Sequence, residues 1–201
     1  METYALFVVA SALLVATPGP NVALIVGTSL GYGARTGFVT VAGVNFGLVL
    51  QLSAVVAGMS WIVELFESHF DAIRYAGAGY LLVLGVTQLL SRQQAKLRDA
   101  PALRGERAFA RGLAVAFANP KTLLFHAAFL PQFLTAGAES RGELWLLAAT
   151  FAVIAAVGDG LYALFAARAR VALGGWARRF ADRASGAILI GGAAVLLAVR
   201  R

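Results

Sequence analysis

Cysteine is absent from the 201 residues, and charged residues are scarce. The missing cysteines exclude disulfide bonds and thiolate metal sites. Charged residues make up 13% of the chain, whereas ordinary soluble domains carry about 25%. Because 60% of the residues are hydrophobic, the remainder cannot cover the surface of a soluble globular domain.

Several functional patterns are missing as well. The chain has no GxxxxGK[ST] loop, which binds nucleotide phosphates, so ATP is not expected to be the direct energy source. It has no His/Asp/Glu set with metal-ligand spacing and no nucleophile next to a base. We therefore expect no enzyme activity, no catalytic residue, no metal and no cofactor. The Met-Glu-Thr start lacks lysine and arginine, so a cleaved signal peptide is not expected.

Long apolar runs occupy most of the chain. Six of them are close to the length of about 20 residues that crosses a bilayer as a helix. They are Tyr4–Val26, Phe38–Phe66, Ile73–Leu90, Gly112–Leu134, Leu144–Ala167 and Ala184–Val199. A transmembrane β-barrel would show alternating segments of about 10 residues, which these are not. The sequence predicts an all-α polytopic membrane protein whose single transmembrane domain spans residues 1–201.

The placement of the basic residues predicts an orientation. Most of them lie in the connectors 92–111 and 168–183, with Arg35 in the first connector, whereas the other two connectors are acidic. By the positive-inside rule the basic connectors are cytoplasmic, so both termini are expected outside the inner membrane. Arg200 and Arg201 run against this assignment. Because the connectors account for the net charge of +7, no nucleic-acid partner is expected.

The two halves of the chain, residues 1–91 and 112–201, resemble each other across the basic connector 92–111. The matching segments are Ala16–Asn21 with Ala118–Thr122, and Arg74–Ala78 with Arg183–Ala187. Halves of three spans each must run through the membrane in opposite directions. Proline-interrupted segments at matching positions of two such halves indicate a transporter binding site. The sequence thus predicts two inverted three-helix repeats with broken first and fourth helices.

A proline-broken helix offers binding groups that a regular helix hides. Pro18 and Pro20 lack an amide proton and disturb carbonyls, and in hydrocarbon such a break survives only against protein or a wet cavity. The freed amides would receive a carboxylate and the freed carbonyls an ammonium, so the break suits a zwitterion. The alternative is a plain proline kink. The predicted substrate-binding residues are Thr17, Pro18, Gly19, Pro20, Asn21, Asn45, Asn119, Pro120 and Lys121.

Two charges lie deep within the apolar runs. Lys121 and Asp159 are expected to pair, because a lysine at the bilayer centre costs about 2.5–3.5 kcal/mol. Either group could handle a coupling proton; the alternative is an ion pair that only fixes helix register. Tyr162, one turn beyond Asp159, could orient it. His126 is a further candidate proton carrier, with a plain hydrogen-bonded histidine as the alternative. The predicted coupling residues are Asp159, Lys121 and His126.

Four stretches carry a resemblance to a known family. They are Thr17–Asn21 (TPGPN), Tyr75–Gly85 (YAGAGYLLVLG), Asn119–Lys121 (NPK) and Phe129–Phe133 (FLPQF). With these, the chain resembles the small exporters typified by the lysine exporter and the homoserine/threonine resistance proteins. At Gln51 many relatives are expected to carry histidine, so a proton role at that position is in doubt.

The resemblance implies export of amino acids or their analogues, driven by the membrane potential or the proton gradient. Our leading interpretation is a secondary transporter that exports amino acids or related small zwitterions by proton-coupled alternating access. The alternative is an uncoupled channel or facilitator for small polar solutes. The expected partners are the small-molecule substrate and the lipid bilayer, and the glycine-rich helix faces are compatible with a homodimer.

Overall fold

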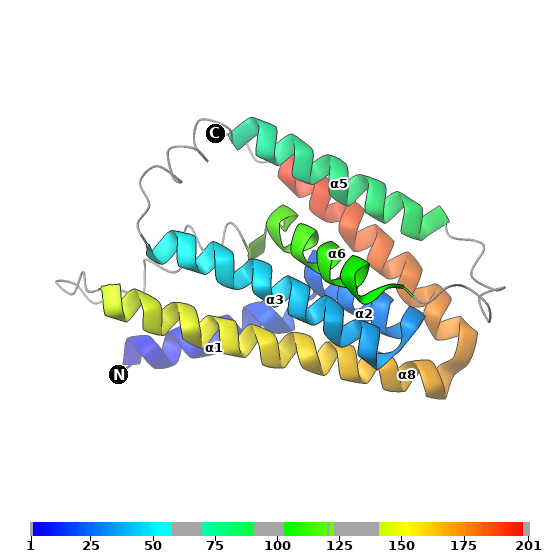
Figure 1. Ribbon diagram of the computed structural model, residues 1–201, viewed down its shortest axis with the longest axis horizontal. Coiled ribbons are helices and arrows are strands. Elements are labelled where there is room, and N and C mark those ends of the chain that lie inside the picture. The colour runs from blue at the N-terminus through cyan, green and yellow to red at the C-terminus, as the bar shows by residue number, and fades with distance from the viewer. Residues whose placement is uncertain (1, 58–69, 91–102, 120, 123–140, 199–201) are drawn as a thin grey trace.

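A computed structural model describes residues 2–57, 70–90, 103–119, 121–122 and 141–198. The regular elements in these ranges are α-helices (Figure 1), which confirms the predicted all-α class. They are α1 (Glu2–Ala16), α2 (Pro20–Tyr32), α3 (Ala34–Val56), α5 (Phe70–Leu90), α6 (Gly105–Ala118) and α8 (Arg141–Ala198).

Two helical segments are long and apolar enough to cross a membrane: α3 and the part Gly142–Ala172 of α8. The pair α1 and α2 adds a third crossing if the two helices, bent by 51° at their junction, count as one broken span. Shorter apolar segments lie in α5 (Ala78–Thr87) and near the end of α8 (Arg183–Val195). The described residues thus provide two membrane-spanning helices, or three with the broken pair. That all six predicted segments cross the membrane stays a prediction.

Helix α8 contains both of the last two predicted spans. Its 58 residues would extend about 87 Å if straight, far more than the hydrocarbon core of about 30 Å. Figure 1 shows that α8 instead bends sharply and that its last part returns beside α5. The predicted connector 168–183 is helical rather than a loop. Alanine and arginine dominate this stretch, and both are strong helix formers.

Glycines bring α3 and α6 into close contact. A Cβ atom on Gly43 would lie 2.1 Å from the carbonyl oxygen of Phe109, and one on Gly112 would lie 2.4 Å from that of Thr40. Only glycine fits such an approach. Further along, a Cβ on Gly47 would lie 2.9 Å from Ala116, so the two helices run in the same direction. Such glycine positions let two helix backbones approach each other closely.

The outer surface of the helices is apolar. Leu13 of α1 is 65% exposed, Val83 of α5 is 64% exposed and Val153 of α8 is 63% exposed. Inside, Phe7 of α1, Leu48 of α3 and Phe151 of α8 belong to one buried cluster. Because these exposed side chains are apolar like those of the core, the surface of the helices is compatible with the hydrocarbon of a membrane.

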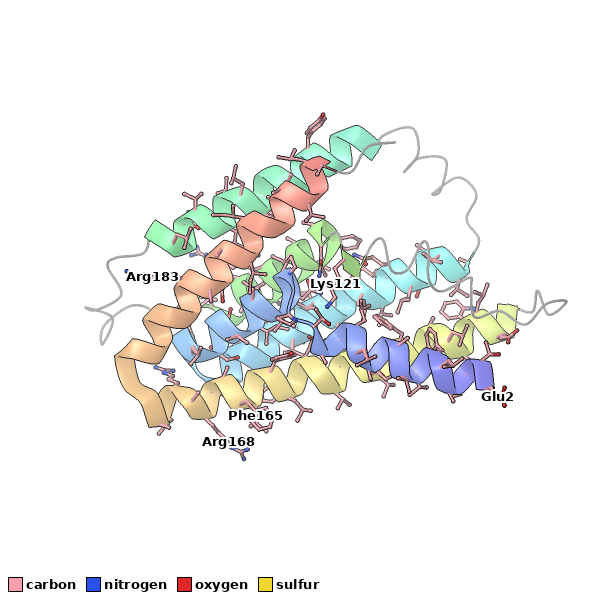
Figure 2. All side chains as sticks on the ribbon, turned by 180° about the vertical axis from the view of Figure 1, so that it is seen from behind. Glu2, Lys121, Phe165, Arg168 and Arg183 are labelled. Carbon is pink, nitrogen blue, oxygen red and sulfur yellow. The ribbon has the colours of Figure 1, made fainter. Side chains whose placement is uncertain are left out.

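Charged side chains separate toward the two ends of the bundle. Figure 2 shows Glu2 at one end and Arg168 and Arg183 at the other. The arginine end includes the turn between α2 and α3, where a Cβ on Gly33 would lie 2.9 Å from a guanidinium nitrogen of Arg170. Gly33 has φ +90° and ψ 176°, a backbone conformation that residues other than glycine rarely adopt.

Candidate functional site

The first apolar run is broken, as the sequence predicts. Helix α1 ends at Ala16, α2 begins at Pro20, and the intervening Thr17, Pro18 and Gly19 are not helical. Pro18 disfavours helical dihedral angles at Thr17 and so ends α1. Pro20 stands at the first position of α2, where its missing amide proton costs nothing.

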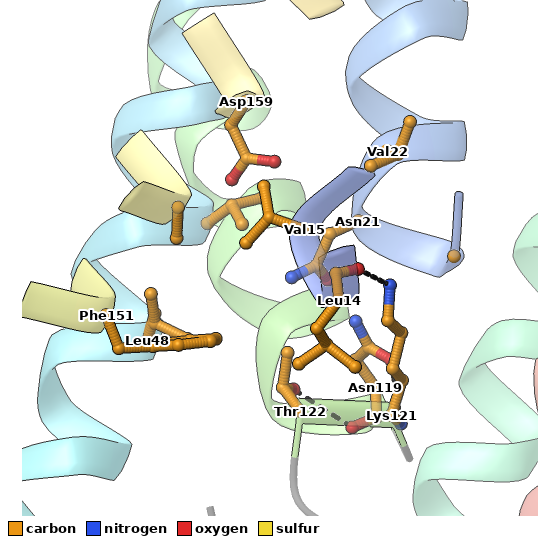
Figure 3. Close-up of a pocket in the computed structure, with 13 residues that line it drawn as sticks. Leu14, Val15, Asn21, Val22, Leu48, Asn119, Lys121, Thr122, Phe151 and Asp159 are labelled. Carbon is orange, nitrogen blue, oxygen red and sulfur yellow. Dashed lines mark hydrogen bonds between the residues drawn. The ribbon is translucent and has the colours of Figure 1, made fainter. Parts of the chain in front are cut away.

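Lys121 occupies the carbonyls at the end of α1. Its Nζ atom donates hydrogen bonds to the carbonyl oxygens of Leu14 and Thr17, and Figure 3 shows the bond to Leu14. These carbonyls gain a cation at the negative end of the helix dipole. The side chain passes directly over Gly19, where a Cβ would lie 3.2 Å from the Lys121 Cδ atom. The small residue at this position therefore gives the lysine its path to the break.

Asp159 of α8 has a different partner. It is 6% exposed and accepts a hydrogen bond of 3.1 Å from the Nδ2 atom of Asn45 on α3. Among the described residues, the predicted ion pair between Lys121 and Asp159 is not formed, because the lysine caps α1 instead. Asn45 is neutral, and its Oδ1 atom is buried without a hydrogen-bond partner. Within the described ranges the carboxylate thus has Asn45 as its hydrogen-bond partner and no ion pair with Lys121.

Tyr162, predicted to orient Asp159, contacts the end of α1 instead. Its hydroxyl group donates a hydrogen bond of 2.7 Å to the carbonyl oxygen of Ala16, the last residue of α1. A phenol has a single proton, so this bond uses its donor. The predicted contact of Tyr162 with Asp159 is therefore replaced by one with Ala16.

The start of α2 is open. Gly19 is its cap residue and contributes no side-chain cap, and the first bond within the helix runs from the amide of Ala23 to the carbonyl of Gly19. The amides of Asn21 and Val22 precede that bond, so they are the unsatisfied donors of the first turn. Asn21 is 8% exposed, and its Oδ1 atom is buried without a hydrogen-bond partner in the described part of the chain. Such a helix start binds anions.

The second break is capped by its own asparagine. Helix α6 ends at Ala118, and Asn119 has an extended backbone with φ −79° and ψ 107°. The Asn119 Oδ1 atom accepts a hydrogen bond of 3.1 Å from the amide of Lys121, and Thr122 donates one of 3.1 Å to the Asn119 carbonyl. On the other side, the Gln51 side chain donates to the carbonyl of Ala116 at 2.9 Å. The amide that follows this break is therefore already satisfied.

These groups surround one pocket (Figure 3). Its polar wall consists of Asn21, Asn119, Lys121, Thr122 and Asp159. Its apolar wall includes Leu14, Val15, Leu48, Phe151 and Ala155. The cavity volume is about 40 Å³. Since one water molecule needs about 10–15 Å³ on this scale, the pocket has room for a few waters or a small polar group.

A family model named LysE type translocator matches residues 12–200. The chain belongs to this family. Among curated relatives of this LysE type translocator, a leucine efflux protein of Klebsiella pneumoniae subsp. pneumoniae is 30% identical over 154 residues (75% of this chain, 73% of that protein). The leucine efflux protein of Enterobacter sp. is 30% identical over 146 residues (72% and 69%). An uncharacterized membrane protein of Pseudomonas aeruginosa is 31% identical over 191 residues (92% and 86%). No solved structure matches the chain.

The family match confirms the resemblance read from the sequence, and the translocator is a helical membrane protein. Of its predicted site residues, Gly19, Asn21, Asn119, Lys121 and Asp159 line the pocket. The other described ones do not line it: the break contains Thr17, Pro18 and Pro20, and Asp159 is hydrogen bonded by Asn45. Pro120 and His126 lie outside the described residues.

Sequence reasoning missed the apolar wall of the translocator's pocket. Leu48 and Phe151 are 2% exposed and belong to the same buried cluster as Phe7. Nothing in the sequence distinguishes an apolar residue that faces a pocket from one that packs in the core. Thr122 also lines the pocket, and its polar side chain next to the break is the signal in the sequence that indicates this position.

Proposed function

We propose that this LysE type translocator exports a neutral aliphatic amino acid across the cytoplasmic membrane. The observation that carries the proposal is the pocket at the break, where anion-binding groups and a buried carboxylate face the same small space. The family match and the leucine efflux relatives support amino-acid export. Membrane location follows from the same relatives and from the apolar exterior.

The charged groups of the pocket match the two ends of a zwitterion. The substrate carboxylate binds the open amides of Asn21 and Val22 at the start of α2. Lys121 has three donors and uses two of them on the carbonyls of Leu14 and Thr17, so in the proposed complex the third binds the same carboxylate. The substrate ammonium binds Asp159. This differs from the sequence prediction, which places the ammonium at the freed carbonyls, because Lys121 binds the carbonyls of Leu14 and Thr17.

The apolar wall selects the substrate side chain. Leu48, Phe151 and Ala155 present aliphatic and aromatic surface, which favours an aliphatic side chain. Asp159 is the only carboxylate that lines the pocket within the described residues, and the α-ammonium uses it. A cationic side chain would lack a counter-charge. The cavity of about 40 Å³ holds the polar head group alone, so binding a whole amino acid requires the pocket to widen during alternating access.

Competition for Asp159 provides the proton coupling in this proposal. A carboxylate that is 6% exposed is costly to leave charged and alone, so it binds either a proton or the substrate ammonium. The proton and the ammonium exclude each other at Asp159. The binding site therefore switches between the two sides of the membrane with one or the other bound. Each cycle then exports one amino acid and imports one proton.

The directions of the helices support the six-span topology with inverted repeats. Helices α3 and α6 run in the same direction, as the second and fourth of six alternating spans must. Matching spans of the two halves also meet, as around a two-fold axis: Gly19 contacts Lys121, and Asn45 binds Asp159. With the arginine end in the cytoplasm, the N-terminus lies outside. Homodimer formation stays a prediction from the sequence.

A substrate-analogue experiment tests the site. Purified protein is assayed for binding of leucine and of 4-methylpentanoate, which lacks the ammonium group. The wild-type protein should prefer leucine by about 10-fold or more, since a hydrogen bond to a charged group contributes about 1.5–3 kcal/mol. Asp159→Asn should remove this preference, whereas the control Glu106→Gln, an exposed carboxylate on α6, should keep it. An unchanged preference in Asp159→Asn would contradict the proposal.

A second experiment separates the exporter from the uncoupled facilitator. Proteoliposomes hold equal concentrations of radiolabelled leucine on both sides, and a pH gradient is then imposed. A proton exchanger should accumulate leucine on the acidic side, and a protonophore should abolish the effect. A facilitator should show no net movement, in which case the coupling proposal fails while the binding site stands.

A further inference from the structure

The hydroxyl group of Tyr162 forms a contact whose position is informative. It bonds the carbonyl oxygen of Ala16, which ends α1 directly before the break and has no partner within α1. The two residues are 146 positions apart in the chain. Tyr162 therefore ties α8 to the residue at which the first helix stops.

Asp159 and Tyr162 lie on the same face of α8, because they are three residues apart in one helix. This face touches α1 at a second point: a Cβ atom on Gly158 would lie 2.3 Å from a methyl carbon of Val15. The carboxylate that receives the substrate ammonium and the hydroxyl that holds Ala16 thus sit on one rigid helical turn against the end of α1.

We propose that Tyr162 is a positioning residue that transmits the state of Asp159 to the break between α1 and α2. This inference rests on the function proposed above. When Asp159 loses its proton and forms an ion pair with the substrate ammonium, the turn of α8 that carries it shifts relative to α3. The Tyr162 hydrogen bond makes the end of α1 follow that shift. The open amides of α2, which follow Ala16 after four residues, then move with it.

The chain offers a matched control for this bond. Tyr4 of α1 and Thr150 of α8 are hydrogen bonded at 2.8 Å, so they join the same two helices with the same tyrosine hydroxyl group. Tyr4 lies in the first turns of α1, far from the break, and neither residue lines the pocket. Tyr4→Phe removes a link between α1 and α8 without touching the link at Ala16.

The test compares Tyr162→Phe with Tyr4→Phe in leucine binding and in transport by proteoliposomes. Tyr162→Phe should bind leucine within about twofold of wild type, because it removes no group that contacts substrate. Its maximal transport rate should fall at least tenfold, since binding no longer moves the break. Tyr4→Phe should leave both quantities unchanged. Wild-type transport by Tyr162→Phe would overturn the inference.

Hydrogen exchange gives a readout that does not depend on any substrate. Losing one hydrogen bond should speed amide exchange in residues 13–17 by about fivefold in Tyr162→Phe. Asp159→Asn replaces the pocket carboxylate by a neutral amide. It should alter amide exchange in residues 13–17 in the protein with Tyr162, and it should have no such effect in the Tyr162→Phe variant. An equal response in both backgrounds would refute the role of Tyr162. The response can be measured even if leucine is not the substrate, so the two proposals fail separately.

Discussion

Replacing Gly43 by alanine should force α3 and α6 apart. The new Cβ atom would lie 2.1 Å from the carbonyl oxygen of Phe109, whereas carbon and oxygen atoms in close helix contacts lie about 3.3–3.6 Å apart. The helices must therefore separate by roughly 1.2 Å, because the obstacle is backbone and cannot rotate away. A gap of about 0.5–1 Å already forfeits a quarter to a half of each dispersion contact.

The size of the effect follows from those contacts. A buried side chain the size of leucine makes about 40–60 contacts of roughly 0.1–0.2 kcal/mol each, so opening the interface around one such side chain costs on the order of 2–4 kcal/mol. Alanine regains about 1 kcal/mol of helix propensity over glycine. Gly43→Ala should thus destabilise the protein by about 1–3 kcal/mol.

Thermal unfolding in detergent measures this difference, with Gly79→Ala as the control. Gly79 lies inside α5 and a Cβ there would meet nothing within 4 Å, so alanine should stabilise by about 0.5–1 kcal/mol. The two substitutions should therefore shift the unfolding temperature in opposite directions, by roughly 2–4 °C per kcal/mol. If Gly43→Ala is as stable as Gly79→Ala, the close approach of α3 and α6 is wrong.

Two further substitutions test local backbone structure. Gly33→Ala should cost about 1–3 kcal/mol in thermal unfolding, because the φ of +90° at the turn between α2 and α3 strains any other residue; an unchanged unfolding temperature would count against that turn. Asn119→Ala should cost about 0.5–2 kcal/mol by removing the cap on the Lys121 amide, while Asn119→Asp should keep most of the stability. Equal unfolding temperatures for the two Asn119 variants would show that the cap is not formed.

The sequence predicted the helical class, the break and most of the polar wall of the pocket, because each has a local signal. Proline marks the break at Pro18 and Pro20, and charges within apolar runs mark Lys121 and Asp159. The partners of these charges have no such signal. Lys121 could have paired with Asp159 or with freed carbonyls, and only the arrangement of the helices decides that the carbonyls of α1 are nearer. The helical connector of α8 was missed because its arginines also suit a loop.

The difference between the two breaks has a consequence for stoichiometry. A protein made of two matching halves would carry two equivalent sites if both breaks were open. Here Asn119 satisfies the amide that follows the second break, whereas the amides of Asn21 and Val22 after the first break keep their binding capacity. Within the described residues, an open anion-binding end therefore follows the first break and not the second. Equilibrium binding should therefore saturate at one amino acid per chain.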